Sequence, residues 1–249
     1  MPKTFPGFSA TMPAFFRGLV KNNDRAWFAA HKEAFERDVR GPMLELLAQV
    51  NDALRTFAVE HVVEPPAKAL YRIYRDTRFS KDKTPFKDHI GATFHRRGLP
   101  RNNSAGFYFG VSHAQVEVAG GMYMPGPDEL AAVRAAMVRG PKEFLAVLAD
   151  KRLARALGPV KGEQAKRPPK GWEAHAHSPA AEYLKFKQLY WYTVLPAKVA
   201  LTAKLKGEVV SRFKAVAGAV DWLNGAILAA RAEAAGEAAA APKRPDPMW

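Results

Sequence analysis

The chain has 249 residues, of which 48% are apolar, and a formal net charge of +14. This apolar content is sufficient for a sizeable core, and the absence of cysteine excludes disulfides, thiol nucleophiles and thiolate metal sites. The N-terminus has no apolar run of signal-peptide length, and no segment approaches the roughly 20 apolar residues that cross a bilayer. We therefore expect a cytoplasmic protein with no membrane-bound part.

The first sixty residues have the apolar spacing of helices. Ser9 is placed to cap a first helix, and Asn22-Asn23-Asp24 interrupts that helix and offers a new cap. Gly41-Pro42 marks the start of a third helix, because proline is tolerated in the first helical turn. Pro65-Pro66 cannot continue a helix, and the helical region is expected to end there.

The middle of the chain has the composition of a sheet. Three to five antiparallel strands are expected between about residues 68 and 124, including Gly106–Ser112 and Gln115–Ala119 with a turn near His113. The run Phe107-Tyr108-Phe109 beside basic residues is compatible with base stacking. Three consecutive aromatics, however, place two rings on one face and one on the other, so core packing explains at least part of the run.

Helical patterns return after Gly120-Gly121, first from Asp128 and Pro141 and then from about residue 179 to residue 231. Within this last region, Trp191 and Tyr192 are interpreted as core or loop-anchoring residues. Residues 158–179 are basic, rich in Pro and Gly, and typical of a loop. Residues 232–249 are Ala-rich and then Pro-rich, and we expect disorder there.

The order of these patterns predicts one α+β domain over residues 1–231. It would consist of a helical N-terminal region, a central antiparallel sheet at about residues 68–124 and a helical C-terminal region. Two basic windows stand out from an almost neutral remainder: residues 68–101 and 151–170 carry +7 and +6 of the net charge. Such windows favour attraction to phosphates or to acidic partners.

The segment of residues 72–87 is the strongest functional signal. It holds six cations, two carboxylates and three aromatic rings in sixteen residues. Cations this dense repel one another unless carboxylates or an anionic ligand lie among them, and two carboxylates cannot neutralise six cations locally. The segment therefore predicts a site for a small anion that carries phosphate or carboxylate. The cations that would line it are Arg72, Arg75, Arg78, Lys81, Lys83 and Lys87.

Other residues are expected to complete this site. Lys170 would approach from the loop Pro168–Trp172, whose prolines and glycine suit a loop folded over a ligand. If a reaction follows binding, the cations would stabilise developing negative charge, although the sequence specifies no reaction. Two carboxylates would orient the cations and two hydroxyls would add neutral donors: Asp76 and Asp82, and Ser80 and Thr84.

Three alternatives to this hypothesis remain open. The motif could be a structural ion-pair network, in which Arg75 and Asp76 tie a strand to a helix. Both basic windows could form a surface track for nucleic acid, with binding that falls steeply with salt. They could also meet an acidic protein partner.

Other chemistry has weaker signals. The glycine patterns of phosphate loops, dinucleotide folds and serine hydrolases do not occur. His175-Ala-His177 could offer two metal nitrogens, but no acidic cluster stands nearby in sequence, so neither a metal nor a cofactor is expected. His89 and His113 flank predicted strands near the basic motif and are candidates for acid–base work.

The string of residues 75–87 is similar to the signature of DUF2461, a family of uncharacterised bacterial and fungal proteins. That signature is approximately RDxRFSKDKTPYK, and Phe86 is the only departure, by the loss of one hydroxyl. The resemblance runs in order over roughly residues 4–228. It implies an α+β domain of about this length with a shared site around residues 75–87, and it implies no particular reaction. Further similar segments are Phe5–Phe8, Phe16–Leu19, Asn22-Asn23, Trp27-Phe28, Gly120–Pro125, Pro168–Trp172 and Glu182–Lys185.

Overall fold

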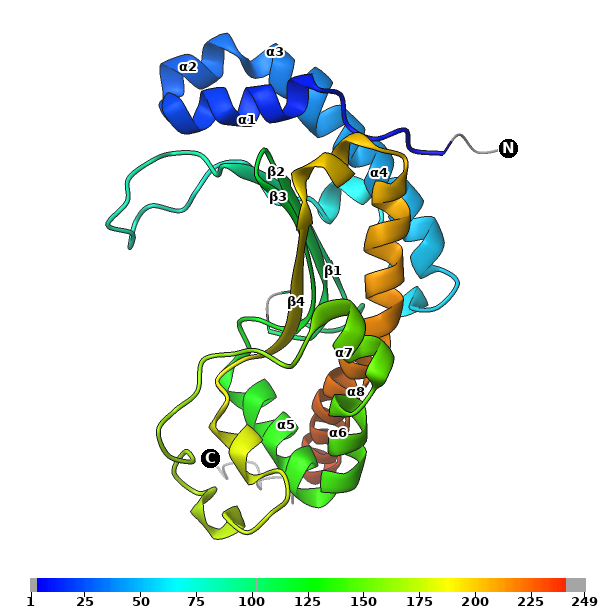
Figure 1. Cartoon of the computed structure of the whole chain (residues 1–249). Coiled ribbons are helices and arrows are strands. Elements are labelled where there is room, and N and C mark those ends of the chain that lie inside the picture. Colours follow the sequence, from blue (N-terminus) through cyan, green and yellow to red (C-terminus); the bar gives the residue numbers. More distant parts are fainter. Residues whose placement is uncertain (1–3, 102, 241–249) are drawn as a thin grey trace, which may run out of the picture.

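A computed structural model describes residues 4–101 and 103–240 of the chain. Its centre is a four-stranded antiparallel sheet in the order β1-β2-β3-β4 (Figure 1). The α+β class expected from the sequence is confirmed. The strands are β1 (His89–His95), β2 (Gly106–Ser112), β3 (Gln115–Met122) and β4 (Leu189–Pro196).

The N-terminal region is helical, as predicted, with two local differences. Asp24 caps the second helix by accepting a hydrogen bond from the Trp27 backbone at 2.8 Å. Ser9 caps nothing, because the residue at the cap position is Ala10 and Ser9 pairs with the Thr11 hydroxyl. Helix α4 begins at Gly41, as expected, but no break in the chain precedes it, since one π-helical turn, η1, joins it to the preceding helix. The elements are α1 (Thr11–Lys21), α2 (Arg25–Ala30), α3 (Lys32–Phe35), η1 (Glu36–Arg40) and α4 (Gly41–Leu54).

The C-terminal region contributes the helix that covers the sheet. Buried residues of α8 recur every three or four positions, which is the spacing of one helix face: Leu205, Val209, Phe213, Val216, Val220, Leu223 and Ile227. This face packs against β3 and β2. None of the helices in the described residues is long and apolar enough to cross a membrane. The helices are α5 (Pro127–Arg139), α6 (Pro141–Leu148), α7 (Lys151–Leu157) and α8 (Lys204–Ala240).

Short helical turns complete the connections. Among them, η6 packs beside β3 and β2 on the way into α8. The turns are η2 (Val59–His61), η3 (Pro66–Lys68), η4 (Glu173–His175), η5 (Ala181–Lys185) and η6 (Ala197–Leu201).

The two faces of the sheet have different environments. Phe107 and Phe109 point into the core, where they meet Phe213 of α8 at ring-centre distances of 5.0 and 6.4 Å. Tyr108, between them, points to the opposite face, as the alternation along a strand requires. The two-to-one division of this aromatic run is therefore confirmed. Helices α4 and α8 lie on the core side, so the packed interior is between them and the sheet (Figure 1).

Three sequence-based expectations differ from the structure. Residues 189–196 form β4, although this region was expected to be helical. Residues 68–88 contribute only isolated bridges, such as Leu70 with Ala92, and no strand of the sheet. Helix α8 continues to Ala240, so residues 232–240 are helical where disorder was expected. The rest of that expected tail, residues 241–249, lies outside the described residues.

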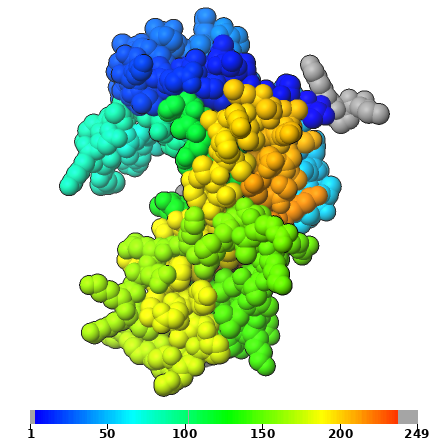
Figure 2. Space-filling model, in the orientation of Figure 1, coloured from blue at the N-terminus to red at the C-terminus, as the bar shows by residue number. Residues whose placement is uncertain are grey.

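The sheet face that carries Tyr108 is open. It is flanked by α1–α3 and the loop around residues 75–85 at one end, and by α5 and residues 158–185 at the other (Figure 1). The surface is hollowed between these two flanks (Figure 2). This face of the sheet is therefore accessible to solvent.

Candidate ligand-binding site

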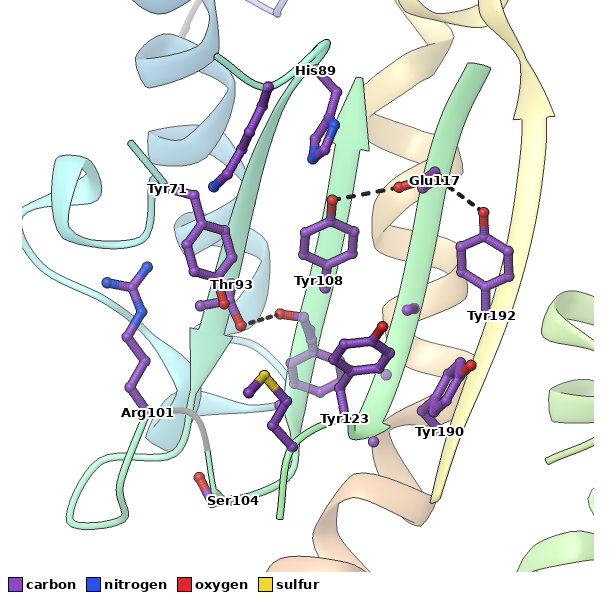
Figure 3. Close-up of a pocket in the computed structure, with 17 residues that line it drawn as sticks. Tyr71, His89, Thr93, Arg101, Ser104, Tyr108, Glu117, Tyr123, Tyr190 and Tyr192 are labelled. Atoms are coloured by element: carbon purple, nitrogen blue, oxygen red, sulfur yellow. Dashed lines mark hydrogen bonds between the residues drawn. The ribbon is translucent and has the colours of Figure 1, made fainter. Parts of the chain in front are cut away.

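A cavity of about 790 Å³ occupies the open face of the sheet (Figure 3). Its lining combines aromatic rings with a few charged and polar side chains, which is the usual composition of a small-molecule site. Five tyrosines form most of the aromatic wall: Tyr71, Tyr108, Tyr123, Tyr190 and Tyr192. Polar and charged groups among the remaining lining residues are Lys87, His89, Thr93, Arg101, Ser104 and Glu117.

The pairing of neighbouring strands places two of these residues, Tyr71 and Glu117, at the ends of one row across the sheet. The Tyr71 backbone donates to the carbonyl of Gly91 at 2.9 Å, Gly91 pairs with Gly110, and Gly110 pairs with Glu117. The two glycines leave room for the Tyr108 ring, since a Cβ on Gly110 would lie 2.5 Å from the Tyr108 hydroxyl. Tyr108 consequently lies between Tyr71 and Glu117 (Figure 3).

The end of this row at Tyr71 is cationic. Lys87 Nζ lies 5.0 Å from the centre of the Tyr71 ring, and the Arg101 guanidinium carbon lies 4.8 Å from it. Burial lowers the pKa of Lys87, and the positive charges of Arg72 and Arg101 lower it further. Among the described residues, neither cation forms an ion pair, and the buried Nε of Arg101 has no hydrogen-bond partner. This end is therefore positively charged without local compensation.

The other end of the row is acidic. Glu117 Oε1 accepts hydrogen bonds from the Tyr192 hydroxyl at 3.0 Å and from Gln115 Nε2 at 2.8 Å. The Tyr108 hydroxyl lies 3.5 Å from Oε2. Burial, followed by the bond to Glu117, raises the pKa of Tyr192 to about 12, and burial raises that of Tyr108 as well. Both phenols therefore stay protonated and act as donors to the carboxylate at neutral pH.

A second hollow of about 400 Å³ adjoins the cavity and shares Lys87 and His89 with it. Arg75, Asp82 and Thr84 line this hollow and bind one another, with Arg75 donating to both partners. Bonds from Thr84 and from Arg75 lower the pKa of Asp82 to about 2. This part of the motif is an ion-pair network at the edge of the cavity.

The outer part of the motif is an exposed loop. Arg78 donates to both carboxylate oxygens of Asp76, at 3.0 and 2.8 Å, and Lys83 Nζ donates to the Thr77 carbonyl at 2.8 Å. Phe79 at the tip is 95% exposed. The ion pairs are thus Arg75–Asp82 and Arg78–Asp76, rather than the Arg75–Asp76 tether of the structural alternative.

The structure brings few of the sequence-predicted residues to the cavity. Lys87 lines it, and three more, Arg75, Asp82 and Thr84, line the adjoining hollow. Exposed Lys170 lies in the segment 158–185 at the other flank of the open face and lines neither space. Exposed Arg72 precedes the projecting loop, directly after Tyr71, and the rest lie along the loop: Asp76, Arg78, Ser80, Lys81 and Lys83.

Most of the cavity wall was missed by sequence reasoning. Arg101 follows β1, while Tyr108, Glu117 and Tyr192 come from three strands, and no local motif connects them. The signal that was present is alternation: Leu189, Trp191 and Leu195 of β4 face the core, and the tyrosines between them face the cavity.

The candidate histidines His89 and His175 lie in different surroundings. His89 Nδ1 is 2.9 Å from Asp88 Oδ1, and its ring points into the cavity (Figure 3). His175 lies 5.9 Å from the Trp172 ring, outside the cavity. In the part of the chain that the structure describes, no group of three or more His, Asp or Glu side chains is placed to hold a metal ion.

Fold and site together define an α+β protein whose open sheet face carries an aromatic cavity with one cationic and one acidic end. The chain belongs to the DUF2461 family, whose model, described as a conserved hypothetical protein, matches residues 11–222. The resemblance seen in the signature segment is thereby confirmed. Comparison with curated proteins and with solved structures found no match.

Proposed function

We propose that this protein binds a small anionic, phosphate-bearing ligand in the tyrosine-lined cavity. Lys87 and Arg101 contact the anion, and the tyrosine rings pack against the remainder of the ligand. The observation that carries the proposal is the pair of cations around Tyr71 that have no carboxylate partner among the described residues.

The electrostatic argument follows from the contrast within the motif. At the tip and in the adjoining hollow, Asp76 and Asp82 already engage Arg78 and Arg75. At the cavity, Lys87 and Arg101 lie near one ring and repel each other. Burial lowers the pKa of Lys87, and repulsion by Arg72 and then by Arg101 lowers it further. A phosphate between the two would relieve the repulsion and supply the missing acceptor for Arg101 Nε. This argument supports binding, and no reaction is proposed.

Single-stranded nucleic acid is a second candidate, supported by one specific observation. The open face of the sheet presents the half-buried rings of Tyr108, Tyr190 and Tyr192, and the exposed cations Arg72 and Lys81 lie before and in the loop that projects at one end of this face. Aromatic side chains on an open sheet can stack bases while cations track the backbone. Several phosphate contacts would then release counterions together, so the affinity would fall steeply with salt. A single small anion would show a shallower salt dependence.

The test compares variants of matched charge. Binding is measured by thermal shift and calorimetry at two salt concentrations. The ligands are inorganic phosphate, sugar phosphates, nucleotides and short oligonucleotides. Lys87→Met and Arg101→Met should each weaken binding of a phosphate ester about tenfold or more, because each removes a charge-assisted hydrogen bond. Lys81→Met removes the same charge from the loop tip and should leave affinity unchanged.

Two results would contradict the proposal. Equal losses in Lys81→Met and Lys87→Met would move the anion site to the exposed loop. Binding of oligonucleotides alone, abolished by salt, would instead support the nucleic-acid candidate.

We also place the protein in the cytoplasm, a location supported by the absence of cysteine, which suits a reducing compartment.

A further inference from the structure

We infer that the ligand is zwitterionic, with its anionic group at Lys87 and Arg101 and an ammonium group at Glu117 among the tyrosine rings. The inference rests on the proposed function and specifies the ligand class for the same cavity. The observation that supports it is the negative charge of Glu117, which lies at the end of the cavity opposite the proposed anion.

Glu117 is a carboxylate in the cavity, and its hydrogen-bond partners among the described residues are neutral. These partners are the hydroxyls of Tyr192 and Tyr108 and the amide of Gln115. These donors orient the carboxylate without neutralising it. No lysine, arginine or histidine in the described residues pairs with it. A ligand cation would therefore find a half-buried, pre-oriented counter-charge.

The surrounding rings add to the preference for a cation. Tyr108 pairs across the sheet with Ala119, and Ala119 pairs with Tyr192, so two tyrosines flank one small residue. Their backbones are two strand spacings apart, about 9.6 Å, which leaves a slot above Ala119. Tyr123 and Tyr190 meet edge to face at 5.3 Å beside this slot. Tyrosine faces attract ammonium groups through the ring quadrupole.

Geometry also sets the span of the ligand. Tyr71 and Glu117 are three strand positions apart in the row through Gly91 and Gly110, which corresponds to about 14 Å between backbones. Side chains from both ends point into the same cavity and shorten this separation (Figure 3). A phosphate and an amine joined by a chain of several bonds would reach both ends.

The test uses a pair of probes that differ in one group. Aminohexyl phosphate carries an ammonium group, and hydroxyhexyl phosphate carries a hydroxyl at the same position. The wild-type protein should bind the amine about tenfold or more tightly than the hydroxyl analogue, as measured by calorimetry. Glu117→Gln keeps an acceptor for Tyr192 and should remove this preference by weakening only the amine. Glu163→Gln, an exposed carboxylate outside the cavity, is the matched control and should retain the preference.

The outcomes separate this inference from the proposed function. Equal affinity of the wild-type protein for both probes would overturn the zwitterionic ligand and leave anion binding intact. An equal loss of both probes in Glu117→Gln would assign Glu117 a structural role and also overturn the inference. Failure of the wild-type protein to bind either phosphate would overturn both. If Lys87→Met binds both probes more weakly but still binds the amine more tightly than the hydroxyl analogue, the result would support one cationic and one acidic end in the cavity.

Discussion

The Asn23 side chain pairs with the backbone of Phe86 as a neighbouring strand would. Asn23 Nδ2 donates to the Phe86 carbonyl at 3.0 Å, and Asn23 Oδ1 accepts from the Phe86 amide at 3.0 Å. Asn51 makes the same two-way contact with Val63, and Asn224 makes it with Ala105. The contact at Phe86 joins the family signature to the turn between α1 and α2, next to Lys87.

Replacing Asn23 should therefore loosen the base of the signature loop. We expect Asn23→Ala to lower the free energy of unfolding by about 1–3 kcal/mol, because the Phe86 amide and carbonyl lose their partner in a half-buried position. Chemical denaturation measures this change. Asn22→Ala is the control, since the Asn22 side chain donates an exposed hydrogen bond to the Gly18 carbonyl. Equal effects of the two substitutions would show that the contact at Phe86 contributes little.

Substitution of the two phenylalanines of the signature should affect stability to very different extents. Phe86 is 2% exposed and stacks on Phe28 at 4.2 Å, so Phe86→Ala should cost about 3–5 kcal/mol of stability. Phe79 is 95% exposed, and Phe79→Ala should change stability by less than about 0.5 kcal/mol. Urea unfolding of both variants gives the comparison. A large loss in Phe79→Ala would mean that the loop tip packs in solution.

Gly120 allows α8 to approach the sheet closely. A Cβ at this position would lie 2.4 Å from Val216 Cγ1, so Gly120→Ala should destabilise the protein by about 1–3 kcal/mol through overpacking. The double variant Gly120→Ala with Val216→Ala should recover part of this loss, as a double-mutant cycle would measure. Gly218→Ala should stabilise the helix slightly, because the new Cβ would meet nothing within 4 Å among the described residues beyond its chain neighbours and the nearby backbone of its own helix. Strict additivity of the first two substitutions would contradict the packing argument.

His61 should make stability depend on pH. Burial, with repulsion by Arg96, lowers the pKa of His61 to about 4 from 6.5, and its Nε2 accepts from Asn224 Nδ2 at 3.3 Å. The folded state thus holds the neutral ring. The neutral His61 ring contributes up to about 3 kcal/mol to the free energy of unfolding. This contribution is fully present above pH 6.5 and is lost as the pH falls from there through the folded pKa.

The measurement is the free energy of unfolding from pH 7 to pH 4. His61→Gln should reduce the slope over this range. Part of the slope should remain, because burial and Arg101 lower the pKa of His95 in the same direction. Carboxylates such as Asp76 and Asp82, with pKa values lowered to about 2, act mainly at lower pH. An unchanged slope in His61→Gln would refute the assignment.

Local patterns predicted the parts of the fold whose residues interact with near neighbours. The apolar spacing of α8, the cap at Asp24 and the hairpin of β2 and β3 depend on residues a few positions apart. Strand β4 was missed because it pairs with β3 across about seventy residues, although the alternation of Leu189, Trp191 and Leu195 was visible in the sequence. Tyr190 and Tyr192 were missed with it, since their place in the cavity depends on that pairing.

The sequence by itself determined the α+β class, the family and the density of cations in residues 72–87, because all three are properties of local order and composition. Only the tertiary structure decided which of these cations are compensated. Arg75 and Arg78 find carboxylates within the same loop, whereas Lys87 meets Tyr71 and Arg101 in a cavity shared with Glu117. Coulomb energies depend on the distances between side chains from separate segments, and folding alone sets those distances.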